Sequence, residues 1–130
     1  MTLNDTLHRI TDVPQSVESD LSNEQVEHLL RTSLQLLRLR FHNGYYFNTY
    51  SILENLSTQL EQMYPTTGAE YRQIIHALIR KEDELLPQVL QALEIDITKK
   101  VEADEQIAIS KLLTAETVQR DRSLLSYFLG

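Results

Sequence analysis

Residues 41–64 read FHNGYYFNTYSILENLSTQLEQMY, and this stretch predicts the fold of the chain. Asn43 and Gly44 suit the left-handed backbone conformation with which many helices end. Beyond them, apolar residues recur every three or four positions through Leu53, Leu56 and Leu60, a spacing typical of one face of a helix. The stretch therefore predicts the turn and the second helix of an antiparallel helical hairpin.

The first helix of this hairpin is predicted over about residues 22–42. Ser22 and Gln25 have the spacing of a capping box, in which each side chain bonds the other residue's backbone N–H. Arg38 and Arg40 fall in the last turn, where cations suit the negative end of the helix. The apolar stripe expected to face the core consists of Val26, Leu29, Leu30, Leu34, Leu36, Leu37 and Phe41.

Further helices are expected after this hairpin. Residues 65–68, Pro-Thr-Thr-Gly, indicate a loop, and a third long helix is predicted from about Ala69. A break near residues 81–83 would start another helix that holds Pro87 in its first turn. The alternative is one helix over residues 69–94 with a proline kink. Two more helices are predicted, at about 98–113 and 114–129, and the apolar C-terminal end is expected to dock.

The fold class predicted from these elements is all-α. The chain is expected to form an antiparallel helical bundle, or stacked helical hairpins, of six to seven helices with no sheet. Only three glycines and three prolines occur among 130 residues, and that scarcity disfavours the many tight turns of a strand-rich protein. We divide the chain into an N-terminal arm, 1–21, with a short helix near 4–11, and a single helical domain, 22–130.

Composition bounds the function further. The net charge of −7 comes from mixed charges without a basic patch, so direct nucleic-acid binding is disfavoured and a basic protein partner is favoured. No apolar run approaches the about 20 residues that a membrane span needs. The absence of cysteine excludes disulfides and thiolate metal sites and is compatible with a reducing compartment, so we predict a cytoplasmic protein.

Catalytic and metal-binding motifs are not found, so we predict no enzyme activity, no cofactor and no metal. His42 and His76 each lie four residues after an arginine, on one helix face, but helical nucleases of the HEPN type use a wider arginine–histidine spacing. The alternative is a small helical enzyme, nuclease-like or a metal-assisted hydrolase, that uses His42 or His76 with neighbouring arginines and carboxylates.

An aromatic cluster is the sequence feature that points to a partner. Because Tyr45, Tyr46 and Phe47 are consecutive, they cannot all face one core, and exposed aromatic side chains are favoured anchors of interfaces. We therefore predict a protein-interaction module, such as an adaptor, assembly chaperone or inhibitor, whose partner is basic or presents a helix. Homodimerisation is left open. The predicted partner-binding residues are Phe41, Tyr45, Tyr46, Phe47 and Tyr50.

Part of the chain, at most residues 29–65, resembles the second half of a tetratricopeptide hairpin. The resemblance rests on Gly44-Tyr45-Tyr46 with Thr49 and Leu56 at the offsets where that family places small residues. The sequence departs from the pattern in lacking the tryptophan and the Leu-Gly of the first helix, and Pro65 comes one turn late. The resemblance implies a shared hairpin geometry.

Overall fold

The computed structural model describes residues 2–43, 49–93, 125 and 128–129 and, within α2, leaves out the side chains of residues 39 and 41–43. All regular secondary structure among the described residues is α-helical, so the all-α class of the prediction is confirmed. Its five helices are α1 (Leu3–Thr11), α2 (Asn23–Asn43), α3 (Thr49–Met63), α4 (Pro65–Arg80) and α5 (Glu82–Ala92).

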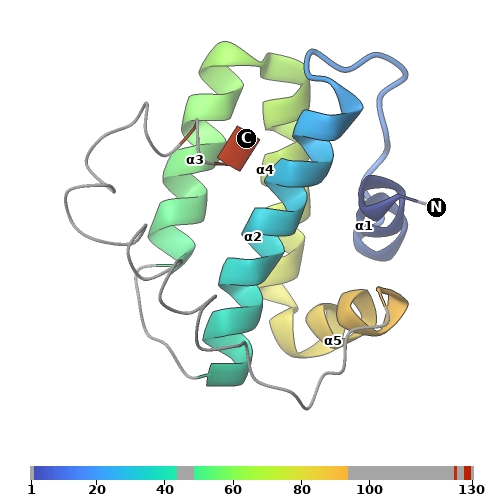
Figure 1. Ribbon diagram of the computed structural model, residues 1–130, viewed down its shortest axis with the longest axis vertical. Helices are drawn as coiled ribbons and strands as arrows, with labels where there is room; N and C mark the ends of the chain where they lie inside the picture. The colour runs from blue at the N-terminus through green and yellow to red at the C-terminus, as the bar shows by residue number, and fades with distance from the viewer. Residues whose placement is uncertain (1, 44–48, 94–124, 126–127, 130) are drawn as a thin grey trace.

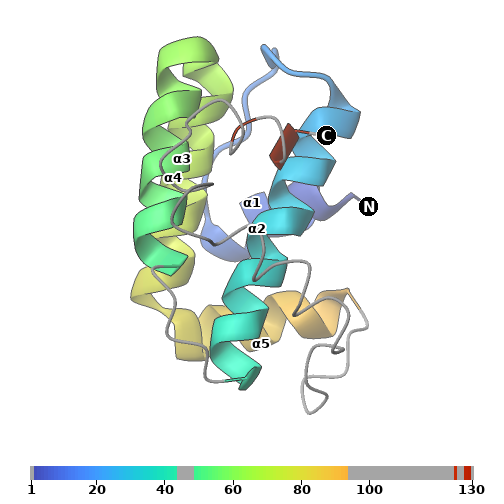
Figure 2. The same ribbon diagram turned by 60° about the vertical axis from the view of Figure 1, so that its left-hand side comes forward.

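The helices α2, α3 and α4 run along the long axis of the molecule, and α5 lies across one end (Figure 1, Figure 2). Helix α3 packs most extensively against α4, while α1 touches α2, α4 and α5. The expected count of six to seven helices is not reached among the described residues. The helices predicted at 98–113 and 114–129 lie outside them, except for Leu125, Phe128 and Leu129, which are helical.

Helix α2 begins where the sequence predicts. The Gln25 backbone N–H donates to Ser22 Oγ at 3.2 Å, and the Ser22 N–H donates to Gln25 Oε1 at 3.2 Å, so the capping box is formed. The predicted apolar stripe faces the core. Its buried members are Val26, Leu29, Leu30, Leu34, Leu36 and Leu37.

The junction between α3 and α4 differs from the prediction. Residues 65–68 are not a loop but the first turn of α4, which starts directly after Tyr64 with Pro65 at its first position. A proline is tolerated there because the first helical N–H groups have no partner within the helix. Gly68 lets the two backbones meet, since a Cβ at this position would lie 2.5 Å from the Glu61 nitrogen.

The N-terminus of α4 is capped from a distant part of the sequence. The Asp20 carboxylate accepts hydrogen bonds from the backbone N–H groups of Thr66 at 2.9 Å and Thr67 at 3.0 Å. It also accepts a hydrogen bond from the Thr67 hydroxyl at 2.5 Å. These bonds satisfy orphan donors of the helix and tie the segment before α2 to α4.

The break between α4 and α5 confirms the prediction of two helices in place of one kinked helix. The position of Pro87 does not follow the prediction, because it lies inside α5 and not in its first turn. The first turn is formed by Glu82, Asp83 and Glu84, whose negative charges favour the positive end of a helix.

Both ends of the chain contribute to the core. Helix α1 is capped by Thr2 and Asp5 and buries Leu3 and Leu7. Phe128 is fully buried, and its backbone carbonyl accepts a hydrogen bond from His28 Nδ1 of α2 at 2.9 Å. The expectation that the apolar C-terminal end docks is therefore confirmed for these residues. The division into an arm and a domain stays a prediction.

Candidate functional site

An open groove of about 960 Å³ lies beside the α3–α4 hairpin. Three segments line it, and we call it the α3–α4 groove. Helix α3 contributes Tyr50, Ser51, Glu54, Asn55 and Thr58; α4 contributes Gln73, His76, Ala77, Ile79 and Arg80; and the end of α1 contributes Thr11, Asp12 and Val13. Rigid helices therefore hold most of its wall.

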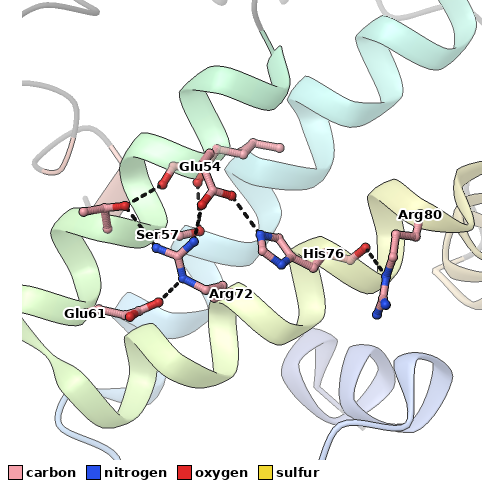
Figure 3. Close-up of polar contacts among 8 residues, drawn as sticks. Glu54, Ser57, Glu61, Arg72, His76 and Arg80 are labelled. Carbon is pink, nitrogen blue, oxygen red and sulfur yellow. Dashed lines mark hydrogen bonds and ion pairs between the residues drawn. The ribbon is translucent and has the colours of Figure 1, made fainter.

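Glu54 lies between the side chains of His76 and Arg72 of the facing helix (Figure 3). Its Oε2 lies 2.8 Å from His76 Nε2, and its Oε1 accepts a hydrogen bond from Arg72 Nη1. Because a carboxylate can only accept, the histidine nitrogen that faces it carries the proton. The hydrogen bond from His76, and then the Arg72 guanidinium, outweigh partial burial and lower the pKa of Glu54.

Arg72 extends the hydrogen-bond network of Glu54 along the α3–α4 hairpin. It donates through Nε to Glu61 Oε1 and through Nη2 to Thr58 Oγ1, the latter at 3.0 Å. Its carboxylate partners, Glu61 first, raise the pKa of the guanidinium, so it stays charged. Residues 54, 58 and 61 of α3 are thus joined to α4 by one planar donor group. The network fixes the side chains beside the groove in a definite arrangement.

The groove carries mixed charge with a small negative balance. Asp12 and Glu54 line it on the acidic side, and Arg80 lines it on the basic side. Arg80 donates only to the His76 carbonyl oxygen, at 3.3 Å, and forms no ion pair with the described residues. Its guanidinium is exposed and keeps further donors available.

A cluster of side chains from three helices meets the groove at Tyr50. The Tyr50 hydroxyl donates to Glu82 Oε2 at 2.5 Å, and Arg40 Nη1 donates to Glu82 Oε1 at 2.7 Å. The Arg40 guanidinium also lies over the Tyr50 ring, 4.2 Å from its centroid, a cation–π contact. Burial, and then the hydrogen bond to Glu82, raise the pKa of Tyr50 to about 12. The cluster joins α2, α3 and α5.

Of the five aromatic residues predicted to bind a partner, the structure describes the side chain of one. Tyr50 is half-buried and lines the α3–α4 groove. Phe41 lies in α2 with its side chain outside the description, and Tyr45, Tyr46 and Phe47 lie outside the described residues. The prediction for these four side chains stays untested.

Of the two histidines named in the enzyme alternative, the structure describes the side chain of one. The His42 side chain is outside the description, whereas His76 lies in the groove beside Glu54, as that alternative expects of its histidine. The four-residue spacing of Arg72 and His76 predicts that they share one helix face, but the sequence does not point to Glu54, Thr58 or Glu61. The only signal for these three residues was their three- and four-residue spacing, which puts them on one face of α3.

The chemistry that this arrangement supports is binding through hydrogen bonds, with the His76 ring held by the Glu54 carboxylate. The Thr58 hydroxyl donates to the Glu54 carbonyl oxygen and accepts from Arg72, and the buried Ser57 hydroxyl donates to the Leu53 carbonyl oxygen.

Among the described residues, no three side chains of the metal-ligating types converge. No helix in the same part of the chain is long and apolar enough to cross a membrane.

In the part of the chain that the structure describes, the fold is all-helical and the α3–α4 groove, open and of mixed polarity, is the candidate site. Comparison with protein-family models, with curated proteins and with solved structures finds no match. The tetratricopeptide resemblance gains no family match either. In the described structure the most extensive helix–helix contact is between α3 and α4, not between α2 and α3.

Proposed function

We propose that the protein is an interaction module of the cytoplasm, an adaptor, assembly chaperone or inhibitor, that binds another protein in the α3–α4 groove. The observation that carries the proposal is the groove itself, which is open, is about 960 Å³ in volume and is lined from three segments. An open groove suits a projecting segment of a partner protein better than a small substrate, which usually binds in a pocket that encloses it.

The lining explains how such a segment would be held. Ser51, Asn55 and Gln73 provide hydroxyl and amide groups that can both donate and accept hydrogen bonds. They stand on rigid helices, so little conformational entropy is lost when a partner binds. The lining residues of α4 extend from 73 to 80, which at 1.5 Å per residue is about 10 Å, or two turns of a partner helix.

Charge favours a basic partner. Among the aspartate, glutamate, lysine and arginine side chains of the lining, Asp12 and Glu54 stand against Arg80, and the whole chain carries −7. A helix with a basic residue near Asp12 therefore meets a favourable potential both locally and at long range.

The experiment starts with affinity capture of a partner from the native host, followed by titration of the purified pair. Ser51→Arg and Gln73→Arg place a bulky cation on either wall of the groove at exposed positions. Each is expected to weaken binding at least ten-fold. Gln62→Arg and Gln88→Arg make the same change at exposed positions outside the groove and are expected to leave affinity unchanged. Equal loss in all four variants would contradict the proposal.

A second candidate function rests on one observation, the hydrogen bond of 2.8 Å between His76 Nε2 and Glu54 Oε2 beside Arg72. A carboxylate-oriented histidine can act as a general acid or base, and an arginine can stabilise an anionic transition state. A nuclease-like or hydrolytic enzyme would then use His76. Hydrolysis of RNA or of a generic phosphodiester by the wild type, lost in His76→Ala, would favour this candidate over the interaction module.

A further inference from the structure

A second hollow lies where α1, α2 and α5 meet, and it shares no described lining residue with the α3–α4 groove. Helix α1 packs against both α2 and α5, and α5 lies across one end of the molecule (Figure 1). The hollow has a volume of about 300 Å³, the size at which pockets begin to hold small ligands. The described residues that line it are Leu3, Arg31, Leu34, Gln35, Arg38, Leu90 and Leu93.

Four leucines form the apolar part of this lining. Leu3 comes from α1 and Leu34 from α2, while Leu90 lies in α5 and Leu93 directly follows it. Leu93 is half-buried, and Leu3 and Leu34 are each 6% exposed, so these side chains keep part of their surface open. Most of the surface that the hollow exposes is apolar. The hollow can therefore receive the apolar part of a ligand, whose burial is favourable.

Two arginines supply the charge of the lining, and both belong to α2. Arg31 and Arg38 are seven residues apart, about two turns, so they project from one face of the helix with Gln35 between them. No aspartate or glutamate occurs among the described lining residues. The net charge of −7 opposes an anion at long range, but salt screens that repulsion beyond about 8–10 Å, whereas the two guanidinium groups act at contact.

Arg31 is available to an anion. Its side chain is exposed, and it forms no ion pair with a carboxylate of the described chain. Glu27, one turn earlier in α2, instead accepts a hydrogen bond from the Asn4 backbone N–H at 3.1 Å. A guanidinium group holds its N–H donors in a planar fork that matches the two oxygens of a carboxylate.

We propose that this hollow binds a small organic anion that has one carboxylate and a short aliphatic chain. The carboxylate lies beside Arg31 and Arg38, and the chain enters the hollow among the leucines. The arginines select for the charge and the leucines for the chain, so a ligand that lacks either one binds more weakly. The site does not rest on the function proposed for the α3–α4 groove.

The test uses three probes: hexanoate, 1-hexanol, which has the chain without the charge, and acetate, which has the charge without the chain. Each is titrated into the whole protein at constant ionic strength, and amide chemical shifts are followed by NMR. Hexanoate is expected to shift the amides of Gln35, Leu90 and Leu93 saturably. We expect 1-hexanol to bind about ten-fold more weakly, because it makes no charged hydrogen bond. Acetate is expected to bind weaker by about the same factor, which corresponds to two buried methylene groups.

Variants assign the preference for the anion to the arginines. Arg31→Gln removes a charge at an exposed position and is expected to weaken the binding of hexanoate about three-fold, the size of a surface ion pair, without changing that of 1-hexanol. Arg31→Gln combined with Arg38→Gln is expected to abolish the preference for hexanoate. Arg9→Gln removes the same charge from an exposed position of α1 outside the hollow and is expected to leave binding unchanged. If the double variant does not fold, Arg31→Gln against Arg9→Gln decides.

Four results would overturn the proposal. They are the absence of saturable shifts at the hollow with hexanoate, affinity for 1-hexanol or acetate equal to that for hexanoate, unchanged binding of hexanoate in Arg31→Gln, and an equal loss in Arg31→Gln and Arg9→Gln.

Discussion

Replacing Gly68 by alanine tests the packing on which the α3–α4 groove depends. Gly68 lies in the first turn of α4, where that helix passes closest to the end of α3. A Cβ at this position would lie 2.5 Å from the nitrogen and 2.6 Å from the Cα of Glu61, and 2.7 Å from the carbonyl carbon of Leu60. All three are backbone atoms, so no side-chain rotation relieves the contact.

Two opposing effects decide the magnitude. Carbon atoms pack best at about 3.5–4.0 Å, so the helices must separate by about 1 Å. Overpacking of this kind costs about 1–3 kcal/mol, and contact with rigid backbone places Gly68→Ala near the upper value. Alanine is favoured over glycine in a helix by about 1 kcal/mol. The net expected loss in the free energy of unfolding is about 2 kcal/mol, or about 8 °C in Tm.

Urea unfolding followed by far-UV circular dichroism measures this loss. Ala69→Gly, at the next and exposed position, reports the helix-propensity effect alone and is expected to cost about 1 kcal/mol. If Gly68→Ala were neutral or stabilising, as helix propensity by itself predicts, the close approach of α3 and α4 at this point would be refuted.

Three further predictions concern stability and binding. Asp20→Ala is expected to cost about 1 kcal/mol of unfolding free energy through loss of the α4 cap. Burial on its own raises the pKa of Asp20, but the hydrogen bonds that its carboxylate accepts outweigh burial and lower this pKa. The cap is therefore fully present above about pH 4, and the difference in unfolding free energy between wild type and variant, measured with urea, should shrink as the pH falls below about 4. A difference that stays constant with pH would contradict this prediction. Tyr50→Phe removes the hydrogen bond to Glu82 and is expected to lower the free energy of unfolding by about 1 kcal/mol. Because the pKa of Tyr50 is raised to about 12, this contribution is present below about pH 10 and is lost as the pH rises through 12. A difference in unfolding free energy between wild type and variant that persists above that pH would argue against this hydrogen bond. Tyr45→Ala or Phe47→Ala is expected to weaken partner binding by about 1–2 kcal/mol in a titration with nearly unchanged Tm, and a large fall in Tm would assign these side chains to the core.

The elements that local sequence determines were predicted well. The start of α2 follows from Ser22 and Gln25, which lie three residues apart and need no distant partner. Its buried face follows from the helical spacing of leucines such as Leu29 and Leu37, since one stripe must face the core. The break before α5 was predicted near residues 81–83, and the acidic run that begins at Glu82 suits the positive end of the helix that follows.

The start of α4 was missed because its causes are not local. Pro65 and Gly68 are typical of a loop, and the sequence near them gives no cap. The cap comes from Asp20, which lies more than forty residues earlier and reaches Thr66 and Thr67 only in the folded chain.

The candidate site was predicted only in part for the same reason. Arg72 and His76 were placed on one helix face because four residues make about one turn. Their acidic partner, Glu54, is twenty-two residues from His76, and only the packing of α3 on α4 brings the two together. The groove depends in addition on the end of α1, where Asp12 lies, and no local pattern relates that segment to α3 or α4.

The most direct test of the proposed function is a contact map of the bound partner. A photoreactive amino acid is placed at Ser51, at Gln73 or, as the control, at Gln88 on α5 outside the groove, and the complex with the captured partner is irradiated. If the groove is the binding surface, crosslinks to one continuous segment of the partner form from positions 51 and 73 and not from position 88. Crosslinks from 88 alone, or from none of the three positions in a complex that remains intact, would contradict the claim that the α3–α4 groove is the binding surface.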